Sequence, residues 1–228
     1  MATNAIDAAA TPAGRSMGHV ALHYGRKEDG PLAARLMALL GYVETQALPL
    51  PNGSMFYRFV VDSRHHARGD GIVYLSLLPE AQAEVVAAAR EALGFGTANE
   101  HPAIARLRSA LESDPEYMFH LGVLVDSLEE LEALTTELQR LNAADPDFKG
   151  RLKVSVNRPR RGDAEIDALL DGSPAFGGVD RYAYGRNGIQ LFVETDILAS
   201  GPLADSMVLE FDYVFPGKTS HILSVVEL

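Results

Sequence analysis

The residues of this 228-residue chain best suited to chemistry are its seven histidines, because the sequence contains no cysteine. Disulfides, thiolate metal sites and cysteine nucleophiles are thereby excluded. Two of the histidines, His19 and His120, each stand at the head of a short apolar stretch, followed by a polar turn and an amphipathic helix. A single histidine at such a place is more often a packed residue than a ligand. Two at matching places of a repeat can meet at one site, which makes them candidate metal ligands.

The other histidines carry less information. His23 lies two residues beyond His19 and therefore on the same face of a strand. It is a candidate catalytic base, with a structural role as the alternative, and the sequence identifies no catalytic acid or base. His65 and His66 stand in a polar stretch, which predicts an exposed loop.

The elements that must position His19 and His120 form a weak internal repeat, and a repeat decides the fold. The first copy predicts strands at 18–25, 42–48, 55–61 and 71–78, with a helix at 31–40 that proline and glycine delimit. The second predicts a strand at 117–125, a helix opened by a capping box from Ser127 to Glu130, and strands at 179–184, 189–195 and 207–215. A strand at 153–157, a short helix at 164–170 and a last strand at 221–226 are weaker predictions, and helices at 79–93 and 102–111 bridge the copies.

We therefore expect an α+β fold in which two β-α-β-β-β units form a curved mixed-sheet half-barrel around a metal site. The predicted organisation is a mobile N-terminal tail at 1–16, a first unit at 17–95, a helical linker at 96–116 and a second unit at 117–228. The second unit is expected to carry a long insertion at 142–178, a stretch rich in proline, glycine and arginine.

This pattern resembles the vicinal-oxygen-chelate superfamily, which includes glyoxalases and extradiol dioxygenases. The segment "NGIQLFVETDILASGPLADSMVLEFDYVFPG" is similar to the end of the 4-hydroxyphenylpyruvate dioxygenases, and "FHLGVLVDSLEELEALTTEL" to their second metal-binding strand and helix. The resemblance covers roughly residues 17 to 217. It implies metal ligation by His19, His120 and Glu210, and substrate binding by Gln190. The chain departs from those dioxygenases in lacking their additional N-terminal units and C-terminal gating helix.

Alternation along "SMVLEFDYVF" agrees with a special role for Glu210, since it places Val208, Glu210 and Asp212 on one face of a strand. A carboxylate on a sheet face among apolar residues costs several kcal/mol unless it is paired or bound to metal. The alternatives are an exposed edge strand or a salt bridge to an arginine.

Two histidines and one carboxylate form the facial triad of non-haem Fe(II) oxygenases. Glyoxalase-type isomerases of the superfamily that the chain resembles typically use a fourth protein ligand, from the last strand of the other unit. Here that strand, at 71–78, offers Tyr74 and Ser76 but no His, Glu or Asp, which favours an oxygenase over an isomerase. We therefore predict an Fe(II)-dependent dioxygenase that acts with O2 on a small phenolic, aromatic or 2-oxo-acid substrate. The alternatives are a metal-dependent isomerase or lyase using Mn, Ni, Zn or Co, and a binding protein without catalysis.

Composition restricts the partners and the compartment. The formal net charge of −11 disfavours nucleic acid and anionic membranes, and no long basic run appears. The sequence has no apolar stretch of about 20 residues and no signal peptide at its start, so we expect a cytoplasmic protein that does not interact with a membrane. The resemblance further implies a homodimer.

Overall fold

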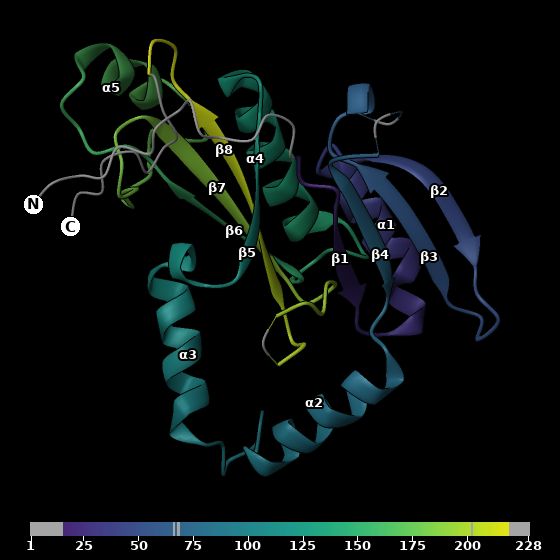
Figure 1. Cartoon of the computed structure of the whole chain (residues 1–228). Helices are drawn as coiled ribbons and strands as arrows, with labels where there is room; N and C mark the ends of the chain where they lie inside the picture. Colours follow the sequence, from purple (N-terminus) through teal and green to yellow (C-terminus); the bar gives the residue numbers. More distant parts are fainter. Residues whose placement is uncertain (1–15, 66, 68, 202, 219–228) are drawn as a thin grey trace, which may run out of the picture.

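The computed structural model describes residues 16–218 apart from 66, 68 and 202, and within this range it contains two α/β units (Figure 1). The first unit consists of β1 (His19–Tyr24), α1 (Gly30–Leu39), β2 (Val43–Pro49), β3 (Met55–Val60) and β4 (Ile72–Leu77). Its four strands lie in the order β1-β4-β3-β2, with β1 parallel to β4 and the other pairs antiparallel.

The second unit repeats this order. It consists of β5 (His120–Leu124), α4 (Leu128–Ala144), β6 (Leu152–Asn157), α5 (Ala164–Asp171), β7 (Gly188–Thr195) and β8 (Met207–Val214). Its strands lie in the order β5-β8-β7-β6, again with one parallel pair, β5 with β8. The predicted α+β fold of two β-α-β-β-β units is therefore confirmed. The described strands form two separate four-stranded sheets and do not close into one barrel.

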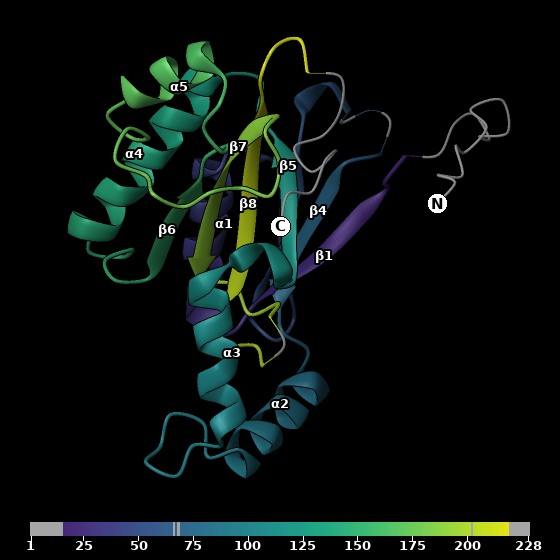
Figure 2. The same cartoon turned by 90° about the vertical axis from the view of Figure 1, so that its left-hand side faces the viewer.

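The helices that join the units are α2 (Glu80–Ala92) and α3 (Pro102–Ser113). Both extend away from the sheets like an arm in the two perpendicular views of Figures 1 and 2. No residue of α2 is buried, and Ile104 is the buried residue of α3. These helices are accordingly held by few apolar contacts with the rest of the described chain.

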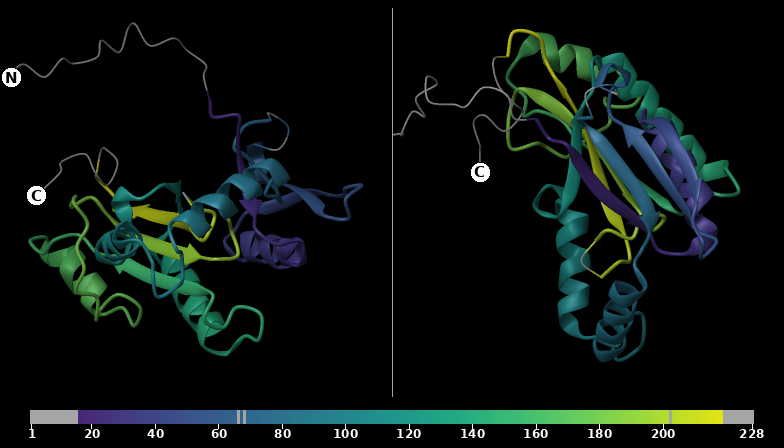
Figure 3. Two further views of the ribbon diagram at one scale, coloured as in Figure 1. Left: turned by 90° about the horizontal axis from the view of Figure 1, so that it is seen from below. Right: turned by 45° about the vertical axis from the view of Figure 1, so that its right-hand side comes forward.

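One apolar core joins the two units, which lie beside each other in both views of Figure 3. It includes Leu36 of α1 and Leu138 of α4, together with the inward-facing residues of both sheets. The helix α4 begins at Ser127, whose hydroxyl accepts a hydrogen bond from the Glu130 amide at 3.1 Å, as the capping box predicts.

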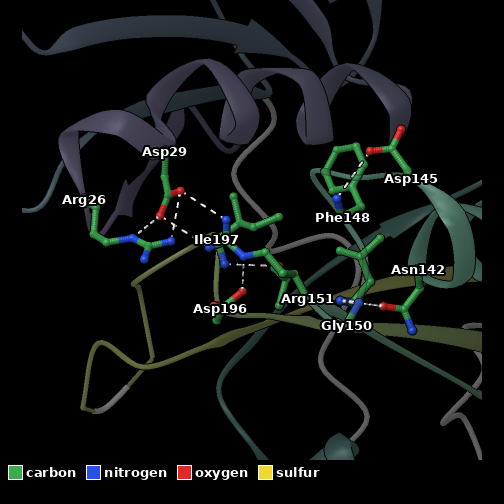
Figure 4. A network of polar contacts seen from close by, with 11 residues as sticks. Arg26, Asp29, Asn142, Asp145, Phe148, Gly150, Arg151, Asp196 and Ile197 are labelled. Carbon is green, nitrogen blue, oxygen red and sulfur yellow. Dashed lines mark hydrogen bonds and ion pairs between the residues drawn. The ribbon is translucent and has the colours of Figure 1, made fainter.

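Ion pairs reinforce the contact between the units (Figure 4). Arg151 of the second unit donates to Asp29 of the first at 3.1 Å and to Asp196 at 2.9 Å. Arg35 of α1 reaches Asp145 at 2.7 Å, and its guanidinium lies 4.7 Å from the centre of the Phe148 ring. The side chain of Arg151 is only 19% exposed, so this pair is screened less than a surface pair.

Two predicted strands differ in the structure. The strand expected at 117–125 is shorter, because Pro115–Tyr117 forms a 3-10 turn before β5. The strand expected at 179–184 is wrong. That segment makes an isolated bridge from Tyr182 to Arg158, and the side chain of Arg181 bonds to Asn157. The strand predicted at 221–226 lies outside the described residues, as does most of the predicted tail.

The stretch expected to be an insertion, 142–178, contains one of the four strands of the second sheet. β6 lies within this stretch and is the edge strand of the second sheet, in the position that β2 takes in the first. The segment added to the repeat is therefore the one between β6 and β7, which holds α5. The division of the chain into the four predicted regions stays a prediction.

Candidate metal centre

The strand β8 carries two carboxylates on the sheet face turned away from α4. Its residues Met207, Leu209 and Phe211 lie in the core, so alternation sends Glu210 and Asp212 to the opposite face. Both are buried there, with 3% of each residue exposed. The predicted alternation is thus confirmed, and it brings two acidic groups onto a face where their charge must be compensated.

The neighbouring strand β5 places His120 beside them. It pairs with β8 in parallel, His120 opposite Val208 and Gly122 opposite Glu210. A Cβ atom at Gly122 would lie 3.3 Å from Glu210 Oε2. The absence of a side chain at Gly122 therefore gives the carboxylate room to turn toward the imidazole.

The third acidic residue, Glu116, comes from the 3-10 turn before β5. The side chain of Asp114 caps this turn by accepting a hydrogen bond from the Glu116 amide at 3.0 Å. Glu116 was not among the ligands predicted from the sequence, which placed it just outside a strand expected to begin at residue 117. The signal that was available is the Asp-Pro pair at 114–115, which is typical of the start of a helical turn.

Glu116, His120 and Glu210 each direct one ligand atom into a common space, and these atoms all lie within 4.8 Å of one another. His120 Nε2 is 2.8 Å from Glu210 Oε2. The amide nitrogen of Gln190, a fully buried residue of β7, donates to Glu210 Oε1 and to Glu116 Oε2, both at 2.6 Å. Gln190 thus holds the two carboxylates in fixed positions.

The protonation of His120 is set by its other nitrogen. Nδ1 lies 2.7 Å from the Met118 carbonyl, which can only accept, so Nδ1 carries a hydrogen. In the neutral ring, Nε2 then presents a lone pair to the Glu210 carboxylate, which is also an acceptor. Such a contact requires a cation between the atoms or a proton on Nε2. A backbone carbonyl behind the imidazole is the arrangement that orients metal-binding histidines.

The pKa values follow from this concentration of charge in the protein without metal. The hydrogen bond to Glu210 raises the pKa of His120. Burial opposes the ionisation of Glu210, but hydrogen bonds from His120 and Asp212 outweigh it and lower its pKa. Burial and the charge of Glu210 raise the pKa of Asp212 to about 9, and the same two causes raise that of Glu116. Asp212 therefore carries a proton at neutral pH.

These donors fit a divalent metal ion. They comprise one imidazole nitrogen and two carboxylate oxygens, a set that suits Fe, Mn, Zn and related ions. Bonds of about 2.1 Å at right angles separate ligand atoms by about 3 Å, close to the distance between His120 and Glu210. The cluster can therefore hold a metal ion, and a dication there would offset the charge that raises the pKa of Glu116.

The centre opens into a cavity of about 220 Å³, lined by Glu116, His120, Gly122, Glu210 and Asp212 among others. A cavity of this size accepts a small organic molecule beside the metal ligands. It thus combines the two requirements of an active site, space and a few convergent polar groups.

The structure brings together three of the four predicted site residues, His120, Gln190 and Glu210. His19 is not a member of the described metal-binding cluster, and its ring lies 5.1 Å from that of Tyr74 on β4. Its place among the ligands stays a prediction, as does a contact of Gln190 with substrate. His23 lies 3.3 Å from the Ser76 hydroxyl, and burial lowers its pKa.

The four-strand order with one parallel pair, repeated in two units, is the fold of the vicinal-oxygen-chelate superfamily, also called glyoxalase-like. The strand order shows the fold alone. No family model and no curated protein sequence matches the chain. No helix of the described residues is long and apolar enough to cross a membrane.

The solved structures to which the chain is similar are distant. One, from Bacillus cereus and named as a possible glyoxalase, is 11% identical over 87% of this chain and 98% of its own, with a TM-score of 0.36. An antibiotic-binding protein from Streptomyces is 11% identical over 90% of this chain and 100% of its own, with a TM-score of 0.39. A fusion of a xylose isomerase-like barrel with a 4-hydroxyphenylpyruvate dioxygenase is 11% identical over 95% of this chain and 29% of its own, with a TM-score of 0.22.

Proposed function

We propose that this protein is a non-haem Fe(II)-dependent dioxygenase that acts with O2 on a small phenolic, aromatic or 2-oxo-acid substrate. The observation that carries the proposal is the contact between His120 Nε2 and Glu210 Oε2 at 2.8 Å, with His120 Nδ1 fixed by the Met118 carbonyl. Two lone-pair donors are thereby directed at one point in the cavity, which is how a protein prepares a metal site.

His120 and Glu210 are the two ligands on which the proposal depends. We propose His19 of the first unit as the second histidine, because two histidines and a carboxylate are typical of non-haem Fe(II) oxygenases. Glu116 is the alternative third ligand from within the second unit. When bound, the metal supplies a Lewis acid and positions for the substrate and O2.

The remaining residues of the centre position groups and hold protons. Gln190 bridges the Glu116 and Glu210 carboxylates with its single amide nitrogen, and its own carbonyl oxygen is buried without a hydrogen bond. In the metal-free protein, burial and the charge of Glu210 raise the pKa of Glu116, which lines the cavity. In the metal-free protein, burial and the charge of Glu210 raise the pKa of Asp212 to about 9, and a proton on Asp212 limits the negative charge beside the ligands.

The test is the metal content of the purified protein, measured by inductively coupled plasma mass spectrometry. About one iron per chain is expected in the wild type and very little in Glu210→Ala. Glu44→Ala, which removes an exposed carboxylate on β2, is the control and should keep its iron. Circular dichroism of each variant separates loss of metal from loss of fold.

Oxygen consumption then tests the reaction. The Fe(II)-loaded protein is screened in an oxygen electrode with catechols, phenols and aromatic 2-oxo acids. We expect consumption that requires a substrate and is absent in Glu210→Ala. Turnover of a substrate without oxygen, with nickel, zinc or manganese in the centre, would replace the dioxygenase by an isomerase or lyase. No metal after reconstitution with any of these ions would overturn the proposal.

A further inference from the structure

A second and larger cavity, of about 400 Å³, lies where α3 meets the ends of β7 and β8. Its apolar lining includes Ile104, Leu107, Leu111, Phe119, Leu203 and Met207. An apolar cavity of about 150 Å³ already binds a benzene ring in other proteins. This one therefore has space for a fused ring system or an equivalent alkyl group.

The basic groups at its rim already have partners. Arg108 pairs with Glu100 at 2.6 Å, Arg151 with Asp196 at 2.9 Å and Lys153 with Glu194 at 3.6 Å. Since each of these cations is neutralised by a carboxylate, an anionic ligand would find no unpaired positive charge in return for its desolvation. The chemistry of the lining selects an uncharged apolar group.

This cavity and the metal centre are neighbours on one sheet face. Val208 lines the larger cavity and Glu210 the smaller, and the two residues follow each other on the same face of β8. Two residues of a strand span about 7 Å. Met118 makes a second connection, since it lines the larger cavity and its carbonyl accepts from His120 Nδ1. A single small molecule is long enough to reach from one cavity to the other.

We propose that the larger cavity binds the apolar part of the molecule whose polar, oxygen-bearing end is held at the metal centre. This inference rests on the proposed function and narrows its substrate class. The substrate is an elongated compound with a chelating head and an uncharged group at least as large as two fused rings. A compact phenol or 2-oxo acid would fill the centre alone and leave the larger cavity unused.

Two hydroxamic acids test this inference, because both chelate a divalent metal and they differ in the apolar group. Naphthalene-2-hydroxamic acid and acetohydroxamic acid are titrated calorimetrically into Co(II)-loaded protein. Burial of the naphthyl group should tighten binding by on the order of 10- to 100-fold over acetohydroxamic acid. The larger effect is expected only if the ring enters the cavity.

Variants then locate the effect. Leu107→Trp on α3 and Leu203→Trp on the opposite wall fill the cavity with an indole. Each should abolish most of the naphthyl advantage while acetohydroxamic acid binds as in the wild type. Ser109→Trp, on the exposed face of α3 and outside the lining, is the matched control and should keep the advantage.

The outcomes separate the inference from the proposed function. If acetohydroxamic acid binds and the naphthyl group adds nothing, the inference is wrong and the metal centre stands. If the protein binds no metal, the proposed function fails, and the uncharged dye N-phenyl-1-naphthylamine tests the cavity by itself. Its fluorescence should then rise on wild-type protein and not on Leu107→Trp, and an equal rise on both would overturn the inference.

Discussion

The outward faces of the two sheets have the same backbone register and opposite chemistry. In the second sheet His120 is opposite Val208, and Glu210 lies two residues further along β8. In the first sheet His19 is opposite Ile72, and the residue two further along β4 is Tyr74. The repeat thus conserves a histidine in each unit and replaces the carboxylate by a phenol in one of them.

The replacement extends to the next strand. Gln190 of β7 donates to Glu210 at 2.6 Å, whereas the matching place on β3, with the register continued by one residue, is Phe56. The Phe56 ring lies 5.4 Å from that of Tyr74. Contacts between aromatic rings in the first unit therefore occupy the positions at which the second unit has hydrogen bonds and charged groups.

This difference teaches how one fold divides a task between two copies of a unit. The second sheet concentrates charge that a metal ion can neutralise, while the first offers aromatic surface that suits an organic molecule. The paired units can do this because the inward faces of both sheets pack into one core, so residues on the outward faces can change without disturbing the packing behind them.

The largest expected effect is on metal affinity, and it tests the comparison directly. His120→Ala should weaken binding of Fe(II) or Mn(II) by about 100-fold or more, since loss of a residue that only supports a ligand already costs 10- to 100-fold. Under the proposed ligand set His19→Ala should weaken binding to a comparable degree, and Tyr74→Phe should leave it unchanged. Isothermal titration calorimetry with each metal measures all three.

The same three variants, with Glu116→Ala added, show whether the first unit supplies a metal ligand. If His19→Ala binds metal like the wild type while Glu116→Ala does not, the centre belongs to the second unit alone, with Glu116, His120 and Glu210 as its ligands. The first unit would then contribute aromatic surface and no ligand.

Much of this arrangement was predictable from local patterns, and the exceptions have physical causes. Alternation along β8 placed Glu210 and Asp212 on one face, because a strand embedded in a core must bury Leu209 and Phe211. Glu116 escaped prediction because its position depends on a single turn and on the remote donor Gln190.

The strand expected at 179–184 failed for a related reason. Its apolar and aromatic residues suit a strand, but Arg181 donates to the carbonyls of Glu112 and Ser113, and the Tyr184 hydroxyl bonds to Asp114. These contacts tie the segment to the end of α3 and to the turn that carries Glu116. Tertiary partners of this kind leave no periodic signal in the sequence.

The next largest effect is a dependence of stability on pH, caused by the buried Asp212 of the second sheet. Asp212 has a pKa of about 9 in the folded protein against about 3.9 in unfolded chains. A raised folded pKa stabilises the protein below pH 4 and destabilises it as pH rises toward 9, by up to about 1.4 kcal/mol per pH unit. Asp212→Asn should remove this slope in metal-free protein. Urea unfolding at pH 5, 6.5 and 8 measures it.

A gain in stability of Asp212→Asn over the wild type that widens with pH is the expected result. An equal difference at all three pH values would mean that Asp212 ionises normally and that the charge of the second sheet is compensated in another way.

The smallest expected effect is on stability, and it comes from an ion pair that joins the two units. Arg151→Gln removes the ion pair with Asp29 of the first unit, which is largely buried, and the pair with Asp196. The unfolding free energy should fall by about 1 to 2 kcal/mol, more than for an exposed pair such as Arg140 with Glu137. Arg140→Gln is therefore the matched control, with a much smaller expected loss. Metal affinity distinguishes the ligand sets at the same time: a centre confined to the second unit should bind metal normally in Arg151→Gln, whereas one that needs His19 should bind it more weakly as the units loosen.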